Sequence, residues 1–185
     1  MKESEIKKLF NEFKNEIAEF ANDIKESVSE INQSKIRGFE IVSETKRKFT
    51  NETITLPTRS TKKSAGYDFY SNDTITIKPL EKFAFFTDVK SYMKDDEYLE
   101  IVPRSSIGIK KDLALSNTIG VIDSDYYSNP ENDGNIIISL RNLGKSDITI
   151  EKGERIAQGI FKKYLVADSG NSENERTGGV GSTNK

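Results

Sequence analysis

The feature that most constrains the fold is a series of short segments in which apolar and polar residues alternate. Alternation with a period of two is typical of half-buried strands. Many such segments at a spacing of roughly ten residues, separated by turn residues, predict a β-sandwich or β-barrel with no second helix. The segments that we expect to form strands are 39–42, 53–56, 74–77, 83–89, 98–102, 113–115, 136–138, 148–150 and 156–164.

The N-terminal segment has a different pattern and predicts one amphipathic helix over residues 3–33. Its apolar residues recur at spacings of three and four, and nearly all other positions are polar. A helix of ~30 residues is roughly 45 Å long, so its apolar stripe needs a partner to cover it. We expect three copies to bundle as a coiled coil or to pack across subunits; docking on the parent domain or binding a separate protein are the alternatives. The stripe consists of Ile6, Phe10, Phe13, Ile17, Phe20, Ile24, Val28 and Ile31.

Composition divides the chain into three parts. Residues 1–35 form the helical segment, 36–166 the β domain and 167–185 a polar tail rich in Gly, Ser, Asn and Glu. The composition of the tail is typical of a mobile segment.

Charge and residue usage exclude several classes of function. The net charge is −2, which argues against a general nucleic-acid binder. Since the chain lacks His and Cys, disulfides, thiolate chemistry and an imidazole base are excluded, and acid–base work falls to Asp, Glu, Lys or Tyr. No apolar run approaches the ~20 residues that cross a membrane. With no apolar signal-peptide core at the N-terminus, these features predict a cytoplasmic protein.

The stretch 120–126, Gly-Val-Ile-Asp-Ser-Asp-Tyr, is the strongest candidate for a site. We expect the segments before and after it, 113–115 and 136–138, to be two strands joined by a hairpin. A carboxylate at the mouth of such a hairpin can hold a water molecule, and the ring of Tyr126 can wall a small planar ligand. A simple acidic turn on a β domain is the alternative that this stretch alone leaves open.

Four more stretches stand in a fixed order around it: 64–68, 103–108, 153–158 and 176–183, the last being Arg-Thr-Gly-Gly-Val-Gly-Ser-Thr. Together the five stretches resemble the five ordered motifs of the homotrimeric dUTPase family. The resemblance covers residues 38–185. One motif of this kind is a weak signal, whereas five in the right order are a specific one.

The resemblance implies a fold, an assembly and an activity. It implies a jelly-roll-like β-barrel that forms a homotrimer with shared active sites, and a C-terminal arm that closes over the substrate on a neighbouring subunit. It also implies hydrolysis of dUTP to dUMP and pyrophosphate, which keeps uracil out of DNA and supplies dUMP for dTMP synthesis. Mg²⁺ would be bound mainly through the triphosphate, in keeping with the preference of this ion for phosphate oxygens and water.

The resemblance also assigns roles to single residues. Asp123 would activate the attacking water, and Tyr126 would lie beneath the deoxyribose. Asp68 and Gln158 would face the metal through water. The remaining substrate contacts would come from Arg104, Ser105, Ser106, Asn117, Val121, Ile122, Ile137, Gln158, Arg176, Gly181, Ser182 and Thr183.

Two departures from the family pattern stand out. The arm carries Val180 where the family usually has an aromatic residue before Gly-Ser-Thr, and its spacing from Arg176 is one residue short. The segment Tyr127–Asp133 is inserted before Gly134. Base–aromatic stacking contributes about 1–3 kcal/mol, so we expect Tyr127 or another ring near the hairpin to replace the missing one.

Two rival functions remain at this point. A dCTP deaminase shares the fold, but that family places a Glu in the strand after the hairpin, where this chain has Ser139. A non-catalytic nucleotide-sensing or protein-binding module would use the helix as its docking element. The joint presence of Asp123, Arg104, Gln158 and Arg176 favours an enzyme over both.

Overall fold

The computed structural model describes residues 3–33, 35–170, 174 and 176–179. The chain divides into two compact units, residues 1–36 and 37–185. Neither helix in the described part of the chain is long and apolar enough to cross a membrane.

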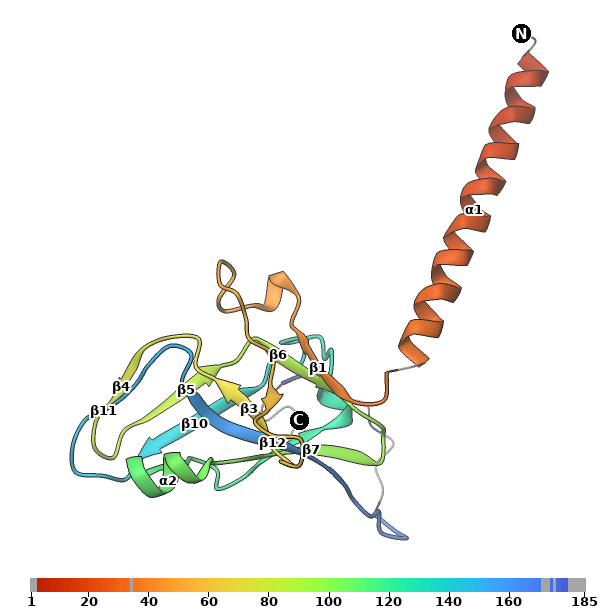
Figure 1. The fold of residues 1–185 in the computed structure, drawn as a ribbon. Helices are drawn as coiled ribbons and strands as arrows, with labels where there is room; N and C mark the ends of the chain where they lie inside the picture. Colours follow the sequence, from red (N-terminus) through yellow and green to blue (C-terminus); the bar gives the residue numbers. More distant parts are fainter. Residues whose placement is uncertain (1–2, 34, 171–173, 175, 180–185) are drawn as a thin grey trace. The chain divides into compact units, whose positions relative to one another are not determined.

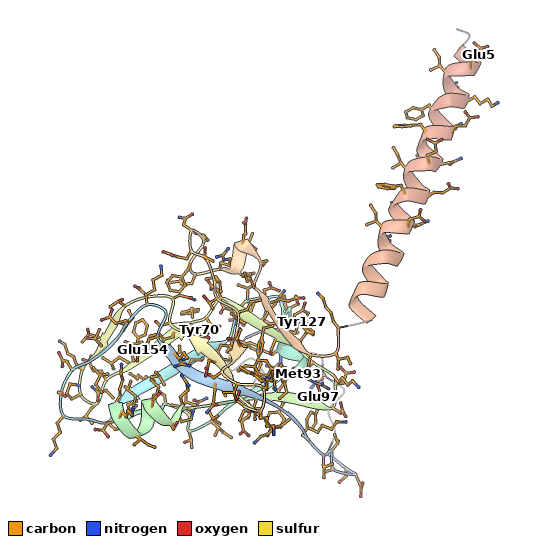
Figure 2. The ribbon with its side chains drawn as sticks, viewed as in Figure 1. Glu5, Tyr70, Met93, Glu97, Tyr127 and Glu154 are labelled. Carbon is orange, nitrogen blue, oxygen red and sulfur yellow. The ribbon has the colours of Figure 1, made fainter. Side chains whose placement is uncertain are left out.

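Helix α1 (Glu3–Gln33) forms the first unit and confirms the predicted amphipathic helix. No Pro or Gly interrupts these residues. Figure 2 draws the described side chains of the helix as sticks that stand out along its length. Six apolar side chains of the predicted stripe are 48–67% exposed in the single chain: Ile6, Phe10, Phe13, Ile17, Phe20 and Ile24. These six side chains, the part of the stripe that the structure describes, are therefore available to a partner.

The second unit is mainly β, as expected (Figure 1). Its elements are β1 (Gly38–Ile41), η1 (Glu44–Lys46), β2 (Thr58–Arg59), β3 (Tyr67–Tyr70), β4 (Ile75–Ile77), β5 (Lys82–Phe86), β6 (Val89–Tyr92), β7 (Glu97–Val102), α2 (Ser105–Lys111), β8 (Leu113–Leu115), β9 (Gly120–Asp123), η2 (Ser124–Tyr126), β10 (Ile137–Asn142), β11 (Ile148–Ile150) and β12 (Arg155–Lys163).

All described strand pairs are antiparallel. A five-stranded sheet has the order β2-β3-β12-β7-β9, and a three-stranded sheet has the order β5-β10-β8. The pairs β1-β6 and β11-β4 complete the fold. Alternate residues of these strands meet in one apolar core, whose most completely buried members include Leu99, Ile136, Leu140, Ile150 and Ile156.

The expected hairpin is only partly correct. Strands β8 and β10 pair, with Leu115 opposite Leu140, but the chain between them does not turn back directly. It first leaves the three-stranded sheet and forms β9, which pairs with β7 in the five-stranded sheet. The turn before β9 includes Thr118 in the left-handed region, at a φ of 67°. The candidate stretch 120–126 therefore bridges the two sheets.

Two expected strands differ in the structure. Segment 53–56 forms no strand, although Ile54 is buried. Burial of one side of a segment is enough to produce an alternating sequence pattern, but a strand also needs a neighbour to which its backbone can hydrogen-bond. Segment 83–89 is split between β5 and β6. The break falls at Asp88, which has a φ of 55°, and a left-handed residue ends an extended strand.

The expectation of no second helix is wrong, because Ser105–Lys111 forms α2. Only Ile107 of this helix is buried. A single buried position in seven residues gives no apolar periodicity from which a helix could be predicted. The N–H groups of Ile107 and Gly108 both bond to the carbonyl of Arg104, and Asp112 ends the helix in a left-handed conformation.

Deleting residues 1–35 should weaken the assembly and lower the melting temperature by several degrees, because the exposed stripe of α1 would lose the burial that a bundle supplies. Light scattering and thermal unfolding measure both effects. In the full chain, Ile17→Asp on the stripe should have the same effect, and Asn22→Asp on the polar face is its matched control. An unchanged mass and melting temperature after the deletion would rule out this reinforcing role and favour an external partner.

Candidate active site

A pocket of about 540 Å³ lies where the stretch 120–126 bridges the two sheets. This volume is within the range of small-molecule sites, roughly 300–1,000 Å³. The pocket collects residues from β5, β7, β8, β9 and β10 and from the arm. Its lining is Lys82, Ile101, Leu115, Ser116, Asn117, Gly120, Val121, Ile122, Asp123, Tyr126, Ile137, Ile138, Ser139, Arg176 and Gly179.

Tyr126 is the aromatic wall of this pocket and is 6% exposed. The turn η2 directs its ring inward directly after β9 ends. Its hydroxyl donates to the Asn135 carbonyl at 3.0 Å and accepts from the Asn132 side-chain amide at 2.8 Å. Two hydrogen bonds therefore hold the hydroxyl end of the ring in place, as a pre-organised wall for a planar ligand requires.

Asp123 is the carboxylate of the pocket and the last residue of β9. Arg176 of the arm bonds Asp123 at 2.5 Å and Asp125 at 2.7 Å, and its guanidinium lies 5.6 Å from the centre of the Tyr126 ring. Burial raises the pKa of Asp123 above its ordinary value, Arg176 opposes this rise, and the charge of Asp125 adds to it. A carboxylate with a raised pKa is a stronger base than an exposed one.

The structure brings seven of the sequence-predicted site residues into this one pocket: Asn117, Val121, Ile122, Asp123, Tyr126, Ile137 and Arg176. Sequence analysis missed Lys82, Ser116 and Gly179. Lys82 lies on β5, whose neighbour β10 carries Ile137 and Ser139. Nothing in the local sequence could have indicated Lys82, because strand pairing alone brings it to the pocket.

A second cluster gathers the other predicted residues around Asp68, which is 3% exposed. The Asp68 carboxylate pairs with Arg104 at 3.0 Å and with Arg155 at 3.4 Å, and it accepts a hydrogen bond from Ser60 at 2.6 Å. Two cations and a hydroxyl offset the cost of burying this carboxylate. In return Asp68 holds the Arg104 guanidinium in one position at the start of α2.

Gln158 lies in the same cluster, on β12 opposite Asp68 on β3. Its side-chain amide donates to the Pro103 carbonyl at 3.3 Å. A Cβ on Gly66 would lie 2.1 Å from the Gln158 side-chain oxygen, so the glycine makes room for this amide. Ser105 and Ser106 form the exposed first turn of α2 beside Arg104.

The two groups of residues are separated in a single chain. Gln158 pairs with Val102 on β7, whereas Asp123 pairs with Tyr98 four residues further along the same strand. Four steps of ~3.3 Å and two strand spacings of ~4.8 Å place the Cα atoms of Gln158 and Asp123 roughly 16 Å apart. Arg104, Ser105, Ser106 and Gln158 accordingly do not line the pocket.

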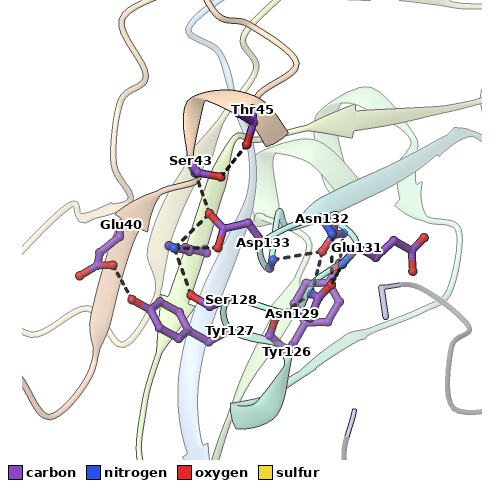
Figure 3. A network of polar contacts seen from close by, with 12 residues as sticks. Glu40, Ser43, Thr45, Tyr126, Tyr127, Ser128, Asn129, Glu131, Asn132 and Asp133 are labelled. Atoms are coloured by element: carbon purple, nitrogen blue, oxygen red, sulfur yellow. Dashed lines mark hydrogen bonds and ion pairs between the residues drawn. The ribbon is translucent and has the colours of Figure 1, made fainter. Parts of the chain in front are cut away.

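The insert Tyr127–Asp133 corrects one expectation. Tyr127 does not line the pocket but donates to Glu40 on β1 at 2.6 Å (Figure 3), and Lys90 lies 4.8 Å from the centre of its ring. Burial and the neighbouring Glu40 carboxylate raise the pKa of Tyr127 to about 12. Tyr127 therefore ties the insert to the barrel and does not replace the missing ring, because its side chain points toward β1.

Three predicted residues of the arm, Gly181, Ser182 and Thr183, lie outside the described residues, as does Val180. In the described part of the chain no group of three or more Asp or Glu side chains could hold a metal ion.

The described strand pairs are all antiparallel, and the pocket has the volume of a small-molecule site. A sequence model of the dUTPase family matches residues 52–184. The deoxyuridine 5'-triphosphate nucleotidohydrolase of Lactococcus lactis subsp. lactis (strain IL1403) is 46% identical over 151 residues, which cover 80% of this chain and 98% of that protein. The Mus musculus protein of the same name is 36% identical over 140 residues, or 73% of this chain and 82% of the relative. The chain therefore belongs to the dUTPase family.

Solved structures agree with this assignment. The dUTPase from Streptococcus mutans has a TM-score of 0.63 at 37% identity and covers 71% of this chain and 99% of its own. A dUTPase from phage phi11 of S. aureus has a TM-score of 0.58 at 21% identity and covers 75% of this chain and 96% of its own, a likeness of fold. The family match begins at residue 52, so helix α1 lies outside it.

An NMR titration of the Asp123 carboxyl group should give a midpoint above ~3.9, the ordinary value for Asp. Arg176→Ala should move the midpoint further up, because Arg176 is the positive charge that lowers this pKa. Arg59→Ala on β2, at the opposite edge of the five-stranded sheet, is the matched control and should leave the midpoint unchanged. A downward shift in the Arg176 variant would contradict the geometry of this pair.

Proposed function

We propose that this protein hydrolyses dUTP to dUMP and pyrophosphate. The observation that carries the proposal is the half-buried Asp123 carboxylate, which lines a pocket with a fixed aromatic wall and is faced by Arg176. The names of the relatives support the same substrate. The direct assay is to incubate the protein with dUTP, dCTP or UTP and Mg²⁺ and to identify the products. Pyrophosphate from dUTP alone supports the proposal, and ammonia from dCTP would overturn it.

Asp123 is the general base in this reaction. The base of the substrate enters the pocket between Asn117, the backbone of 121–123 and the side chain of Ile137, and the deoxyribose lies on the Tyr126 ring. Asp123 accepts a proton from water as the water oxygen attacks the α-phosphorus. The bond from that phosphorus to the bridging oxygen breaks, and pyrophosphate leaves with the electron pair. General-base assistance of this kind contributes about 10²–10⁴-fold.

Phosphate binding falls to the second cluster and the arm. A guanidinium binds phosphate oxygens in a bidentate manner, and Asp68 holds that of Arg104 in place for this purpose. Because this cluster lies roughly 16 Å from Asp123 across the sheet, one chain does not bring both halves onto one triphosphate. A homotrimer in which neighbouring subunits supply the two halves, with Gly181, Ser182 and Thr183 of an arm closing over the phosphates, resolves this separation.

The donor set fits Mg²⁺ held by substrate. Carboxylate clusters that could form a protein cage are absent among the described residues, and the Asp68 oxygens bond to Ser60, Arg104 and Arg155. Such a set suits an ion carried in on the triphosphate, with Asp68 and Gln158 reaching it only through water. When bound, Mg²⁺ withdraws negative charge from the phosphate oxygens and so favours attack by water.

The rival deaminase is less well supported. Ser139 lies in the pocket on β10, where the deaminase pattern requires a Glu, and its hydroxyl shares a hydrogen bond with Ser116 at 2.8 Å. Deamination needs a group that passes a proton to the leaving ammonia. A serine hydroxyl paired with another serine is a poor substitute for a carboxylic acid in that role.

Asp123→Asn should lower kcat by ~10²-fold or more and leave dUTP binding largely intact, because the amide keeps the shape but cannot take the proton. Steady-state kinetics and calorimetric binding measure the two effects. Asp125→Asn is the matched control, since it also removes a partner of Arg176 but leaves the base in place, and it should lower kcat far less. If the Asp123→Asn variant keeps more than about a tenth of the wild-type kcat, Asp123 is not the general base.

Tyr126→Ala should narrow the preference for dUTP over UTP in kcat/KM, because the ring excludes a 2′-hydroxyl by its bulk. Tyr126→Phe keeps the ring and loses only the hydroxyl contacts to Asn132 and Asn135, so it should keep most of the preference. The ratio of kcat/KM for the two nucleotides is the measurement. Equal ratios in wild type and Tyr126→Ala would place the discrimination elsewhere.

A further inference from the structure

The insert Tyr127–Asp133 follows the pocket residue Tyr126 and is a turn held by a network of polar contacts (Figure 3). Asn129, which is 4% exposed, organises it from within. Its side-chain oxygen accepts the backbone N–H groups of Glu131 and Asn132, both at 3.1 Å. Its side-chain amide donates to the Tyr126 carbonyl at 2.9 Å and to the Asn132 side-chain oxygen at 2.7 Å. These four hydrogen bonds fix the backbone from which the Glu131 and Asn132 side chains project.

The same turn is anchored to the barrel from outside. Asp133 accepts the Ser43 backbone N–H at 2.6 Å and pairs with Lys90 of β6 at 2.9 Å. Burial alone would raise the pKa of Asp133, but the hydrogen bonds from Ser43 and Lys90 outweigh it and lower that pKa. Lys46 donates to the Glu131 carbonyl at 2.8 Å. The insert is therefore a rigid surface and not a loose loop.

One end of the arm lies on this surface. The Gly179 N–H donates to the Glu131 carboxylate at 2.6 Å, and both Gly178 and Gly179 are buried. A Cβ on Gly179 would lie 3.1 Å from the Asn132 side-chain nitrogen and 3.4 Å from the Glu131 carboxylate. This close approach favours a residue without a side chain at position 179.

The other end of the described arm segment lies three residues earlier, at Arg176. Its side chain pairs with Asp123 and Asp125, lies over the Tyr126 ring and is 11% exposed. The Tyr126 hydroxyl in turn accepts from Asn132 of the insert. Arm, aromatic wall and insert thus form one connected set of contacts at the edge of the pocket.

We propose that the insert is a docking site for the C-terminal arm, in which Glu131 is a positioning residue that holds the Gly179 N–H and so sets Arg176 against Asp123. The inference rests on the proposed function and deepens it, because it assigns a role to a segment that the activity itself leaves unused. Both partners belong to one chain in the structure. In a symmetric trimer every arm still meets one insert, so the tests below have the same outcome.

The chemistry of the contact explains why a carboxylate serves here. The arm offers backbone N–H groups and small residues, without an aromatic ring before Gly-Ser-Thr. A charged acceptor makes a stronger hydrogen bond to a backbone N–H than a neutral one does. The insert thus positions the arm through a polar contact, where an aromatic side chain would position it through stacking.

Limited trypsin digestion tests the docking directly, because cleavage after Arg176 requires the arm to leave the surface. Glu131→Ala should accelerate that cleavage about tenfold, the order expected on losing one hydrogen bond to a charged group. Glu131→Gln keeps an acceptor and should fall between this variant and wild type. Gly179→Ala, which changes only the arm, should accelerate cleavage as well. Glu44→Ala, an exposed carboxylate on η1, is the matched control and should behave as wild type.

The pH profile of dUTP hydrolysis distinguishes positioning from mere support of the fold. Among the described residues, the charged groups at this part of the pocket are Lys82, Asp123, Asp125, Glu131 and Arg176. If Glu131 sets Arg176 against Asp123, Glu131→Ala should move the acid limb of kcat/KM to higher pH, since the charge that lowers the Asp123 pKa is withdrawn. Glu131→Gln should restore most of the wild-type profile. The melting temperature should stay unchanged.

The outcomes separate this inference from the proposed function. If the wild-type protein does not hydrolyse dUTP, the proposed function is refuted, and the digestion experiment still measures whether the arm docks on the insert. Unchanged cleavage after Arg176 in Glu131→Ala and Gly179→Ala, with an active wild type, refutes the docking alone. Faster cleavage without any shift of the acid limb refutes the positioning of Arg176 by Glu131.

Discussion

The site depends on a buried pair, Asp88 and Asn135, at the junction of β5, β6 and β10. Asp88 is fully buried, and its backbone N–H donates to the Asn135 side-chain oxygen at 3.0 Å, while the Asn135 amide donates back at 2.8 Å. The Asp88 carboxylate also accepts the backbone N–H groups of Lys48 and Phe49. An unpaired carboxylate here would be costly, so this geometry is tightly specified. Because the Asn135 carbonyl accepts the Tyr126 hydroxyl, the pair also sets the aromatic wall of the pocket.

The proposed function depends on how the chain passes between two sheets. Strands β8 and β10 pair with each other, and β9 between them pairs with β7, so Asp123 ends a strand of one sheet and its pocket is lined by both sheets. Half-burial then raises the pKa of Asp123, which suits a base, and Arg176 keeps that rise in check. The cluster around Asp68, to which our proposal assigns phosphate binding, has the opposite electrostatics: its buried carboxylate is surrounded by cations. Asp123 and Asp68 thus lie in the same sheet but in different electrostatic environments.

Particular residues show how far sequence reasoning reached. The order of five motifs predicted the family, the β fold and seven residues of the pocket, because the chemistry of each motif is local. The alternation in 74–77, 98–102 and 148–150 predicted strands correctly, since each has one buried face. It failed at 53–56, where Ile54 is buried without a strand partner, and at α2, where one buried residue gives no period. The sequence did not show that Tyr127 points toward Glu40 and away from the pocket, because side-chain direction in a loop is set by contacts distant in sequence. That another ring near the hairpin replaces the missing one stays a prediction.

The sequence by itself determined which chemical groups are available: in a chain without His or Cys the acid–base work falls to Asp, Glu, Lys or Tyr, and the order of the motifs made Asp123 the predicted base. It also determined the amphipathic helix, since a period near 3.6 without Pro or Gly permits little else. Only the tertiary structure decided that Lys82 lines the pocket, that Asp68 holds Arg104, and that Glu131 meets Gly179. The Asp68–Arg104 and Glu131–Gly179 contacts join residues 36 and 48 positions apart, and the pairing of β5 with β10 brings Lys82 to the pocket. No local pattern encodes them, because they arise only when the two sheets close on a common core.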